Sequence, residues 1–189
     1  DRDKHQDYKI SLSAAQQDQN NPEVITIAGT GSSGSTNGTG TSASFNKPAE
    51  VIKVGDNLFV ADNLNHTIRR IVISTGAVTT LAGTANSYGS TDGYGAKFRH
   101  PTGITFDGSY IYVADSENHL IRRINPNNGY VSTLAGSAGS SGSTDGTGTS
   151  ARFNVPRGIT HDSLNLYVTD FNNHKIRKIV KSSGEVTAL

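Results

Sequence analysis

The chain contains one frame of strictly spaced residues three times, and this repetition constrains its fold more than any single motif. The frames occupy residues 45–83, 98–136 and 153–189. In each frame a Pro lies 14 residues before an Asp, and a His follows that Asp by four residues. Chain length varies only between the frames, in Gly- and Ser-rich connections. A rigid unit with variable connections predicts a structural repeat.

Each frame contains four short segments with strand character, separated by turn residues. In the second frame they are Gly103–Asp107, Tyr110–Ala114, Leu120–Asn125 and Tyr130–Ala135. The segment Val24–Gly29 resembles a fourth strand but precedes the first frame. Four short antiparallel strands per repeat are typical of a β-propeller blade. We therefore predict an all-β propeller segment over residues 23–189, with three four-stranded antiparallel blades plus one extra N-terminal strand.

The second frame, FRHPTGITFDGSYIYVADSENHLIRRINPNNGYVSTLAG, closely resembles the NHL repeat, and it carries Asn-His-Leu at positions 118–120. The resemblance extends over residues 24–189. The Gly-Ser-Thr-Asp-Gly insertions are similar to those of the bacterial extracellular branch of NHL-type β-propellers. The first copy departs from the pattern at two positions, because Glu50 replaces a Gly and Asn37 replaces an Asp of the other copies.

The N-terminal arm, residues 1–22, belongs to no frame. Its segment Tyr8–Ser13 alternates like a strand between polar flanks. We expect this arm either to be disordered or to donate a strand to a neighbouring sheet edge.

The composition excludes several classes of function. The 189 residues carry a net charge of +1, with no Cys and no basic block, so thiolate chemistry is absent and we do not expect nucleic acid as a partner. No apolar run is long enough to cross a bilayer. The chain also lacks Met, so we expect Asp1 to be a processed or engineered N-terminus, with a removed signal peptide as the simplest explanation. We expect an extracellular or cell-envelope location.

The repeated Asp-x-x-Asn-His turn offers an acid and a base three times, yet we interpret it as structural. Asp and Asn stabilise tight turns through hydrogen bonds to the backbone, and each blade needs such a turn. The predicted structural residues are Asp62, Asn65, His66, Asp115, Asn118, His119, Asp170, Asn173 and His174. We predict no catalytic residues.

We also expect no metal and no cofactor. The Gly-rich loops lack the Lys-Ser/Thr of a phosphate-binding loop, and Asp92 and Asp145 are too few oxygen ligands for a dedicated Ca²⁺ site. Two triplets, at Asn37 and Asn65, match the N-glycosylation pattern and are candidate glycosylation sites.

The order of strands within a blade places the connections between blades on the same face as the Asp-x-x-Asn-His turns; we call this the loop face. Loops on a rigid scaffold commonly carry binding sites. The candidate binding residues on this face are Tyr88, Tyr94, Lys97, Arg99, His100, Arg152, Arg157 and Phe171.

Three blades are fewer than a propeller usually needs to close. The alternatives are a two-chain ring, a piece of a longer propeller, or a filament built head to tail. We expect a non-enzymatic extracellular scaffold that self-associates and binds a protein or glycan through the loop face. The alternative is a structural subunit of an extracellular filament, assembled through open blade edges and the arm. A less favoured third reading, from the propeller resemblance, is a fragment of a six-bladed lyase or lactonase.

Overall fold

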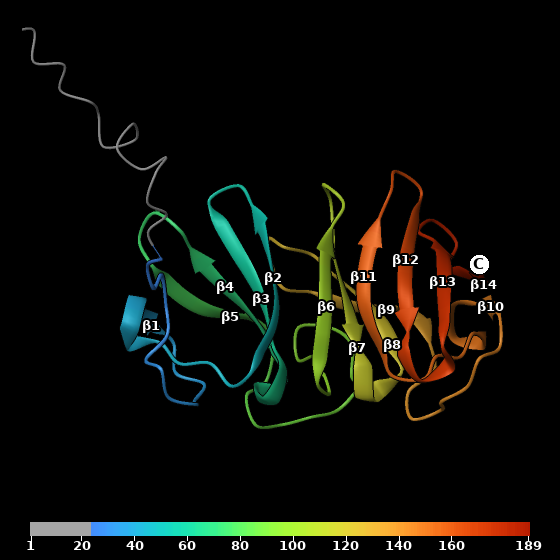
Figure 1. Cartoon of the computed structure of the whole chain (residues 1–189), viewed down its shortest axis with the longest axis horizontal. Helices are drawn as coiled ribbons and strands as arrows, with labels where there is room; N and C mark the ends of the chain where they lie inside the picture. The colour runs from blue at the N-terminus through green and yellow to red at the C-terminus, as the bar shows by residue number, and fades with distance from the viewer. Residues whose placement is uncertain (1–23) are drawn as a thin grey trace, which may run out of the picture.

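The structure, a computed structural model, describes residues 24–189. The predicted N-terminal arm (1–22) lies outside the described residues. Three antiparallel sheets stand side by side in chain order (Figure 1). We call them blades 1, 2 and 3.

Each blade consists of four consecutive strands, ordered in space as they are in sequence. Blade 1 contains β2 (Pro48–Val54), β3 (Asn57–Asp62), β4 (Thr67–Val72) and β5 (Ala77–Gly83). Blade 2 contains β6 (Pro101–Phe106), β7 (Ile111–Asp115), β8 (Leu120–Ile124) and β9 (Val131–Gly136). Blade 3 contains β11 (Pro156–His161), β12 (Asn165–Asp170), β13 (Lys175–Val180) and β14 (Glu185–Ala188). The all-β fold and the three blades are as predicted.

The connections to the blades add short strands at the outer edges, which the sequence pattern does not indicate. β1 (Gly38–Thr39) pairs with β5, and β10 (Gly146–Thr147) pairs with β14. In blade 2 the same position is a single bridge between Gly93 and Val131. Short 3₁₀ turns follow β1 and β10: η2 (Gly40–Ser42) and η5 (Gly148–Ser150). Each connection therefore reaches the outer edge of the blade that it precedes.

The predicted extra strand Val24–Gly29 is not a strand in the structure. A strand needs a hydrogen-bonding neighbour, and this segment lies in no ladder of the described chain. Its end is held instead by a bond from the Gly29 amide to the Gly40 carbonyl, at 3.1 Å.

The hydrophobic core lies between the blades as well as within them. One buried cluster joins residues of blades 1 and 2, including Phe59, Ile68 and Ile104. A second joins blades 2 and 3, including Ile121 and Phe153. Each blade thus buries its apolar sides against its neighbours, as repeats in stacked architectures do.

The two faces of the array differ in their connections. The loop face carries the long connections between blades. It also carries three 3₁₀ turns, which are η3 (Asn63–Asn65), η4 (Ser116–Asn118) and η6 (Phe171–Asn173). The loop face is at the bottom of Figure 1. The opposite face, which we call the turn face, carries the short hairpin turns of the blades (Figure 1, top).

Candidate functional site: the loop face and its buried supports

A buried ion pair lies beneath the loop face in each blade. In blade 2, Asp115 accepts hydrogen bonds from the Arg122 guanidinium at 2.8 Å, from the Asn118 amide at 2.8 Å and from the Arg99 backbone N–H at 2.7 Å. Both charged side chains are fully buried. A buried carboxylate needs such donors to offset its desolvation.

The Arg of this pair also fixes the connection that precedes the blade. Arg122 donates to the Thr91 carbonyl and to the Asp92 carboxylate, and its guanidinium lies over the Phe98 ring at 5.1 Å. The corresponding pairs are Asp62–Arg69 and Asp170–Arg177, each at 2.9 Å. Where blade 1 has Asn37 in place of the second Asp, the amide oxygen accepts from Arg69 at 2.8 Å. In each blade, the Arg side chain therefore connects the third strand, the turn with its Asp, and the preceding connection.

Burial acts strongly on the acid of this pair in blade 2. It raises the pKa of the Asp115 carboxyl to about 6, while the Arg122 charge and the hydrogen bonds oppose the shift. The Asp115 carboxyl can therefore take up a proton near this pH. It does so inside the blade, because the side chain is buried and has no exposed surface.

The turn His of blades 1 and 2 connects each of these blades to the next one. His66, His119 and His174 adopt left-handed backbone conformations, with φ of 59°, 60° and 56°. The Nδ1 atom of His66 accepts the His100 N–H of blade 2 at 3.2 Å, and Nδ1 of His119 accepts the Val155 N–H of blade 3 at 3.1 Å. Burial is the main cause that lowers the pKa of His66 and of His119, which favours the neutral acceptor form.

A groove on the loop face lies next to two stacked pairs of aromatic and cationic side chains. The groove has a volume of about 240 Å³ and is lined by residues of all three blades, among them His100, Glu117 and Arg157. Beside it, Arg99 lies over the Tyr88 ring at 5.3 Å. Arg157 lies over the Phe171 ring at 3.7 Å. The groove itself offers polar and charged side chains to a ligand, and the two aromatic rings lie beside it.

Comparison with known proteins identifies the repeat. No family model matches the chain. The human NHL repeat-containing protein 2 is 37% identical over 144 residues, which are 70% of this chain and 20% of that protein. An auxiliary nutrient binding protein from Bacteroides ovatus superposes with a TM-score of 0.61 at 28% identity, over 74% of this chain and 37% of that one.

The chain belongs to the NHL-repeat β-propeller family. It spans about a fifth of the length of the curated NHL protein that it matches. A streptogramin B lyase superposes with a TM-score of 0.54 at 16% identity, over 75% of this chain and 40% of that one, and shares the fold alone.

The candidate binding residues lie in three different places on the NHL blades. Tyr88, Arg99, His100 and Arg157 lie at or beside the groove. Tyr94 lies instead at the outer edge of blade 2, where its ring meets Tyr130 at 5.2 Å. Phe171 holds the position that Asn63 and Ser116 occupy in the other blades, on the side of blade 3 that no further blade covers, and its ring lies against Arg157 of the groove. The eight residues therefore do not form one surface.

Lys97 and Arg152 support the blades through their backbone. Their carbonyl oxygens accept hydrogen bonds from Arg122 at 3.0 Å and from Arg177 at 2.9 Å. The Arg152 guanidinium also donates to the Thr149 and Ala151 carbonyls. The sequence signal that could have revealed the buried Arg is its constant spacing, seven residues after the turn Asp.

The two candidate glycosylation sites differ in access. Asn65 is buried, and its amide nitrogen donates to Asp62 and to the Gly34 carbonyl, so the folded blade offers no room for a glycan there. Asn37 is exposed.

Within residues 24–189, no His, Asp or Glu side chains gather in threes that could hold a metal ion. In the same range, no helix has the length and apolarity to span a membrane.

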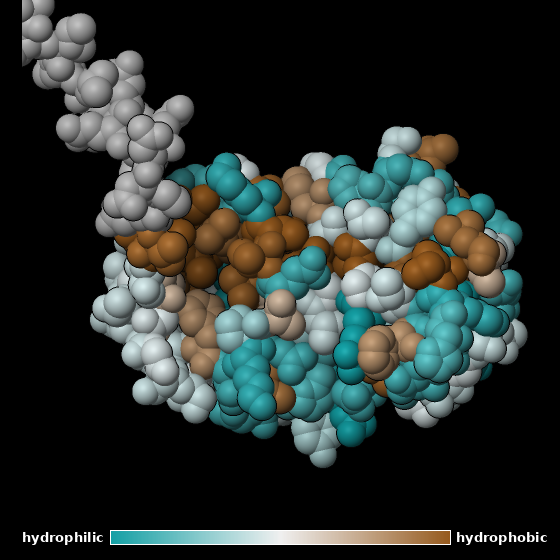
Figure 2. Space-filling model, viewed as in Figure 1, coloured by the Kyte–Doolittle hydropathy of each residue, from teal (hydrophilic) through white to brown (hydrophobic). Residues whose placement is uncertain are grey.

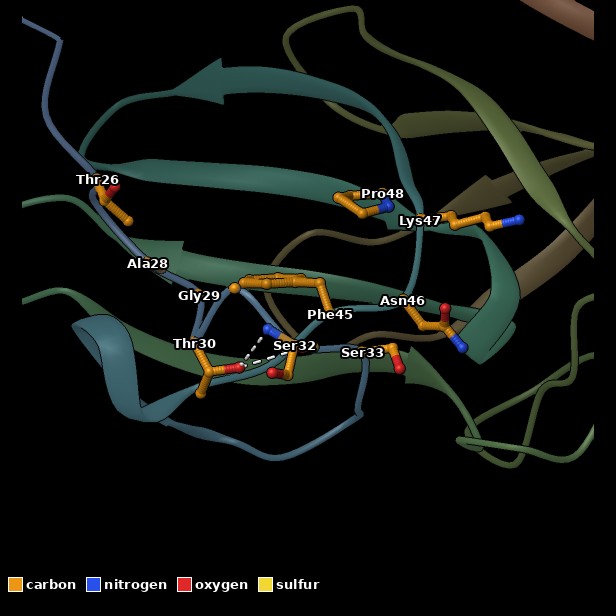
Figure 3. Close-up of a pocket in the computed structure, with 11 residues that line it drawn as sticks. Thr26, Ala28, Gly29, Thr30, Ser32, Ser33, Phe45, Asn46, Lys47 and Pro48 are labelled. Carbon is orange, nitrogen blue, oxygen red and sulfur yellow. Dashed lines mark hydrogen bonds between the residues drawn. The ribbon is translucent and has the colours of Figure 1, made fainter.

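A larger hollow lies on the free side of blade 1. It has a volume of about 580 Å³ and runs between residues 26–33 and residues 45–48. Figure 3 shows Phe45 and Pro48 along this hollow, with Lys47 extending away from it. Thr30 and Ser32 bond to each other at its rim and do not bridge it.

Proposed function

We propose that this NHL chain is a non-enzymatic extracellular scaffold that self-associates through its free blade sides and binds a protein or glycan through its loop face. The observation that carries the proposal is a difference in exposure between equivalent positions. Side chains that are buried at the two junctions between blades are exposed at the two ends of the array.

The free side of blade 3 illustrates this difference. Ile68 and Ile121 are 0% exposed because blades 2 and 3 cover them. Ile176 holds the same position in blade 3, and it is 47% exposed. An apolar side chain on a sheet face favours a partner that removes it from water.

The free side of blade 1 is the complementary surface. Ile104 is 1% exposed at the junction of blades 1 and 2, whereas the equivalent Val51 is 54% exposed. Val24, Ile25 and Ile27 are also exposed. Figure 2 shows apolar side chains gathered over this blade.

The hydrogen bonds at the two junctions within the chain indicate which groups would bond between two copies. Asn63 donates to the Pro101 carbonyl at 3.0 Å, and Ser116 donates to the Pro156 carbonyl at 2.6 Å. Pro48, at the equivalent position in blade 1, lines the hollow of Figure 3. By the same equivalence, the Lys47 N–H of one copy would bond to Nδ1 of His174 in a second copy.

Such contacts join different surfaces of identical chains, so they form rings when the rotation closes. Two copies would supply six blades, within the roughly four to eight blades of known propellers. The same contacts would build a filament if the rotation did not close. The filament is the second candidate function, favoured by the same exposed surfaces.

The loop-face groove is the proposed ligand site of this scaffold. The stacked pair Arg99–Tyr88 supports it, because aromatic faces beside donor groups suit sugar rings and peptide side chains. The Bacteroides neighbour described as nutrient binding is consistent with a binding role. Phe171, whose ring lies against Arg157 of the groove at 3.7 Å, would lie beside this ligand site at the seam of a ring.

Analytical ultracentrifugation over a dilution series tests the self-association. The wild-type chain should sediment as a two-chain particle, and Ile176→Glu should sediment as a single chain. Tyr130→Glu is a matched control, because Tyr130 is 46% exposed on the outer edge of blade 2, away from the free sides. A wild-type chain that is monomeric at every concentration would contradict the proposal.

Glycan- and peptide-array binding tests the loop face separately. Arg99→Ala should weaken binding at the groove, whereas Tyr94→Ala, at the outer edge, should leave it unchanged. Equal binding by both variants and the wild type would place the ligand elsewhere.

A further inference from the structure

A cleft opens on the turn face between blades 1 and 2. Its volume is about 290 Å³. Blade 1 contributes Asn57, Phe59 and Arg70, and blade 2 contributes Phe106, Ser109 and Asn127. Pockets of this size, at the lower end of the range for ligand sites, suit small molecules.

Arg70 is a cation without an acidic partner in this cleft. Within residues 24–189 its guanidinium makes no ion pair, and its buried Nε has no hydrogen-bond acceptor. Its sequence neighbour Arg69 points to the other side of the strand and bonds to Asp62, Ser44, Thr36 and Asn37. A partly desolvated cation is stabilised when an anion approaches it.

The equivalent position at the junction of blades 2 and 3 contains its own acid. There Asp107 accepts from the Lys181 ammonium at 3.0 Å and from the Tyr112 hydroxyl at 3.0 Å. The hydrogen bonds from Tyr110, Ser109, Lys181 and Tyr112 outweigh the effect of burial and lower the pKa of Asp107 to about 2. This carboxylate is therefore ionised and fully engaged.

The repeat frame shows how blade 1 differs. In the repeat frame, Val54 of blade 1 is equivalent to Asp107 of blade 2, and Phe59 is equivalent to Tyr112. On the other side of the cleft, Pro126 of blade 2 is equivalent to Lys181 of blade 3. Arg70 itself corresponds to Arg123, which lies over the Tyr110 ring at 4.9 Å. The cleft between blades 1 and 2 therefore has the cation Arg70 and no carboxylate among its lining residues, whereas the junction of blades 2 and 3 contains the Asp107–Lys181 ion pair.

We propose that the cleft between blades 1 and 2 binds the carboxylate of a small polar ligand, with Arg70 as its principal donor. An Arg guanidinium matches a carboxylate with two parallel N–H bonds. Arg70 is the one cationic side chain among the cleft's lining residues, so a singly charged anion balances it. A multiply charged phosphate would lack further cations.

The other lining groups indicate the rest of the ligand. The Asn57 and Asn127 amides and the Ser109 hydroxyl can bond to hydroxyl groups, while Phe59 and Phe106 present apolar edges. This combination suits the ring of a sugar acid. The ligand class that we assign is a hexuronate-like monocarboxylate, bound on the face opposite to the loop-face groove.

Titration of the ¹⁵N-labelled full chain, followed by NMR, tests the assignment with glucuronate as the probe and glucose and inorganic phosphate as comparisons. Glucuronate should shift the amide signals of Asn57, Ser109 and Asn127 in a saturable way. Arg70→Met should weaken its affinity by at least about tenfold. Arg123→Met is the matched control, and it should bind as the wild type does.

Val54→Asp provides a second variant that does not depend on removing Arg70. It places a carboxylate where blade 2 has Asp107, so it should block glucuronate binding while the chain remains folded. Glucose should produce no saturable shift. The proposal is overturned if glucuronate causes no saturable shift, if phosphate binds as tightly, or if both variants bind glucuronate like the wild type.

Discussion

Arg122 and Asp115 form an ion pair at 2.8 Å with both side chains fully buried. The same pair recurs in the other two blades as Arg69–Asp62 and Arg177–Asp170. It connects the third strand, the turn and the preceding loop of each blade. This arrangement explains why the spacing within the frame is constant while the loops vary in length.

Arg122→Met tests the energetic weight of this ion pair. The substitution leaves Asp115 buried without its charged partner, and such losses typically cost about 3 kcal/mol or more. Urea unfolding should show this decrease in the free energy of unfolding. Arg123→Met should cost much less, on the order of 0.5 kcal/mol, because Arg123 stacks on Tyr110 at the surface. Equal losses would contradict the role of the buried pair.

His66 should make stability depend on pH. Burial lowers its pKa in the folded chain, so the unfolded chain takes up the proton first as the pH falls. The free energy of unfolding should therefore decrease as the pH falls below about 6.5, the usual His value, towards the lowered folded-state pKa. The bond from the His100 N–H requires the neutral ring.

His66→Asn is the comparison for this effect, because Asn tolerates the left-handed backbone and offers an acceptor oxygen without titrating. The stability difference between wild type and variant should change between pH 7 and pH 5. A constant difference would show that His66 does not titrate on unfolding.

Gly103 permits close approach of the innermost strands of blades 2 and 3. A Cβ atom there would lie 2.0 Å from the Arg157 carbonyl oxygen. Gly103→Ala should force the strands apart and lower the free energy of unfolding by about 1–3 kcal/mol. Gly95→Ala is the control, because no atom lies within 4 Å of its added Cβ. Thermal unfolding of both variants measures the contrast.

Val155 is a β-branched residue with a left-handed backbone, at φ 54°. This conformation costs roughly 1–2 kcal/mol for a residue with a Cβ, and Asn adopts it more readily. Val155→Asn should therefore raise the midpoint of thermal unfolding. An unchanged or lower midpoint would mean that Val155 packing outweighs the backbone strain.

The repeat spacing was sufficient to predict the blades, because strand alternation and turn residues are local signals. In blade 2 the strand bounds differ from the predicted ones by at most two residues. The prediction failed for Val24–Gly29, since strand formation depends on a neighbour and not on the segment alone.

The loop-face site was only partly predictable. Tyr88 and Arg99 lie in one connection, and the Arg99 guanidinium lies over the Tyr88 ring at 5.3 Å, a contact that the sequence did not predict. Tyr94 lies elsewhere because that connection first follows the outer edge of blade 2, through the Gly93–Val131 bridge, before it returns to the loop face. Such a path depends on tertiary hydrogen bonds that a linear pattern does not encode. The isolated Arg70 likewise becomes visible only when neighbouring blades are compared in space.

Absolute mass in solution, measured by light scattering on wild type and Ile176→Glu at several concentrations, tests the central claim most directly. The account predicts twice the mass of one chain for the wild type and the mass of one chain for the variant. Identical masses for the two proteins would contradict the assignment of the exposed blade sides as a self-association surface.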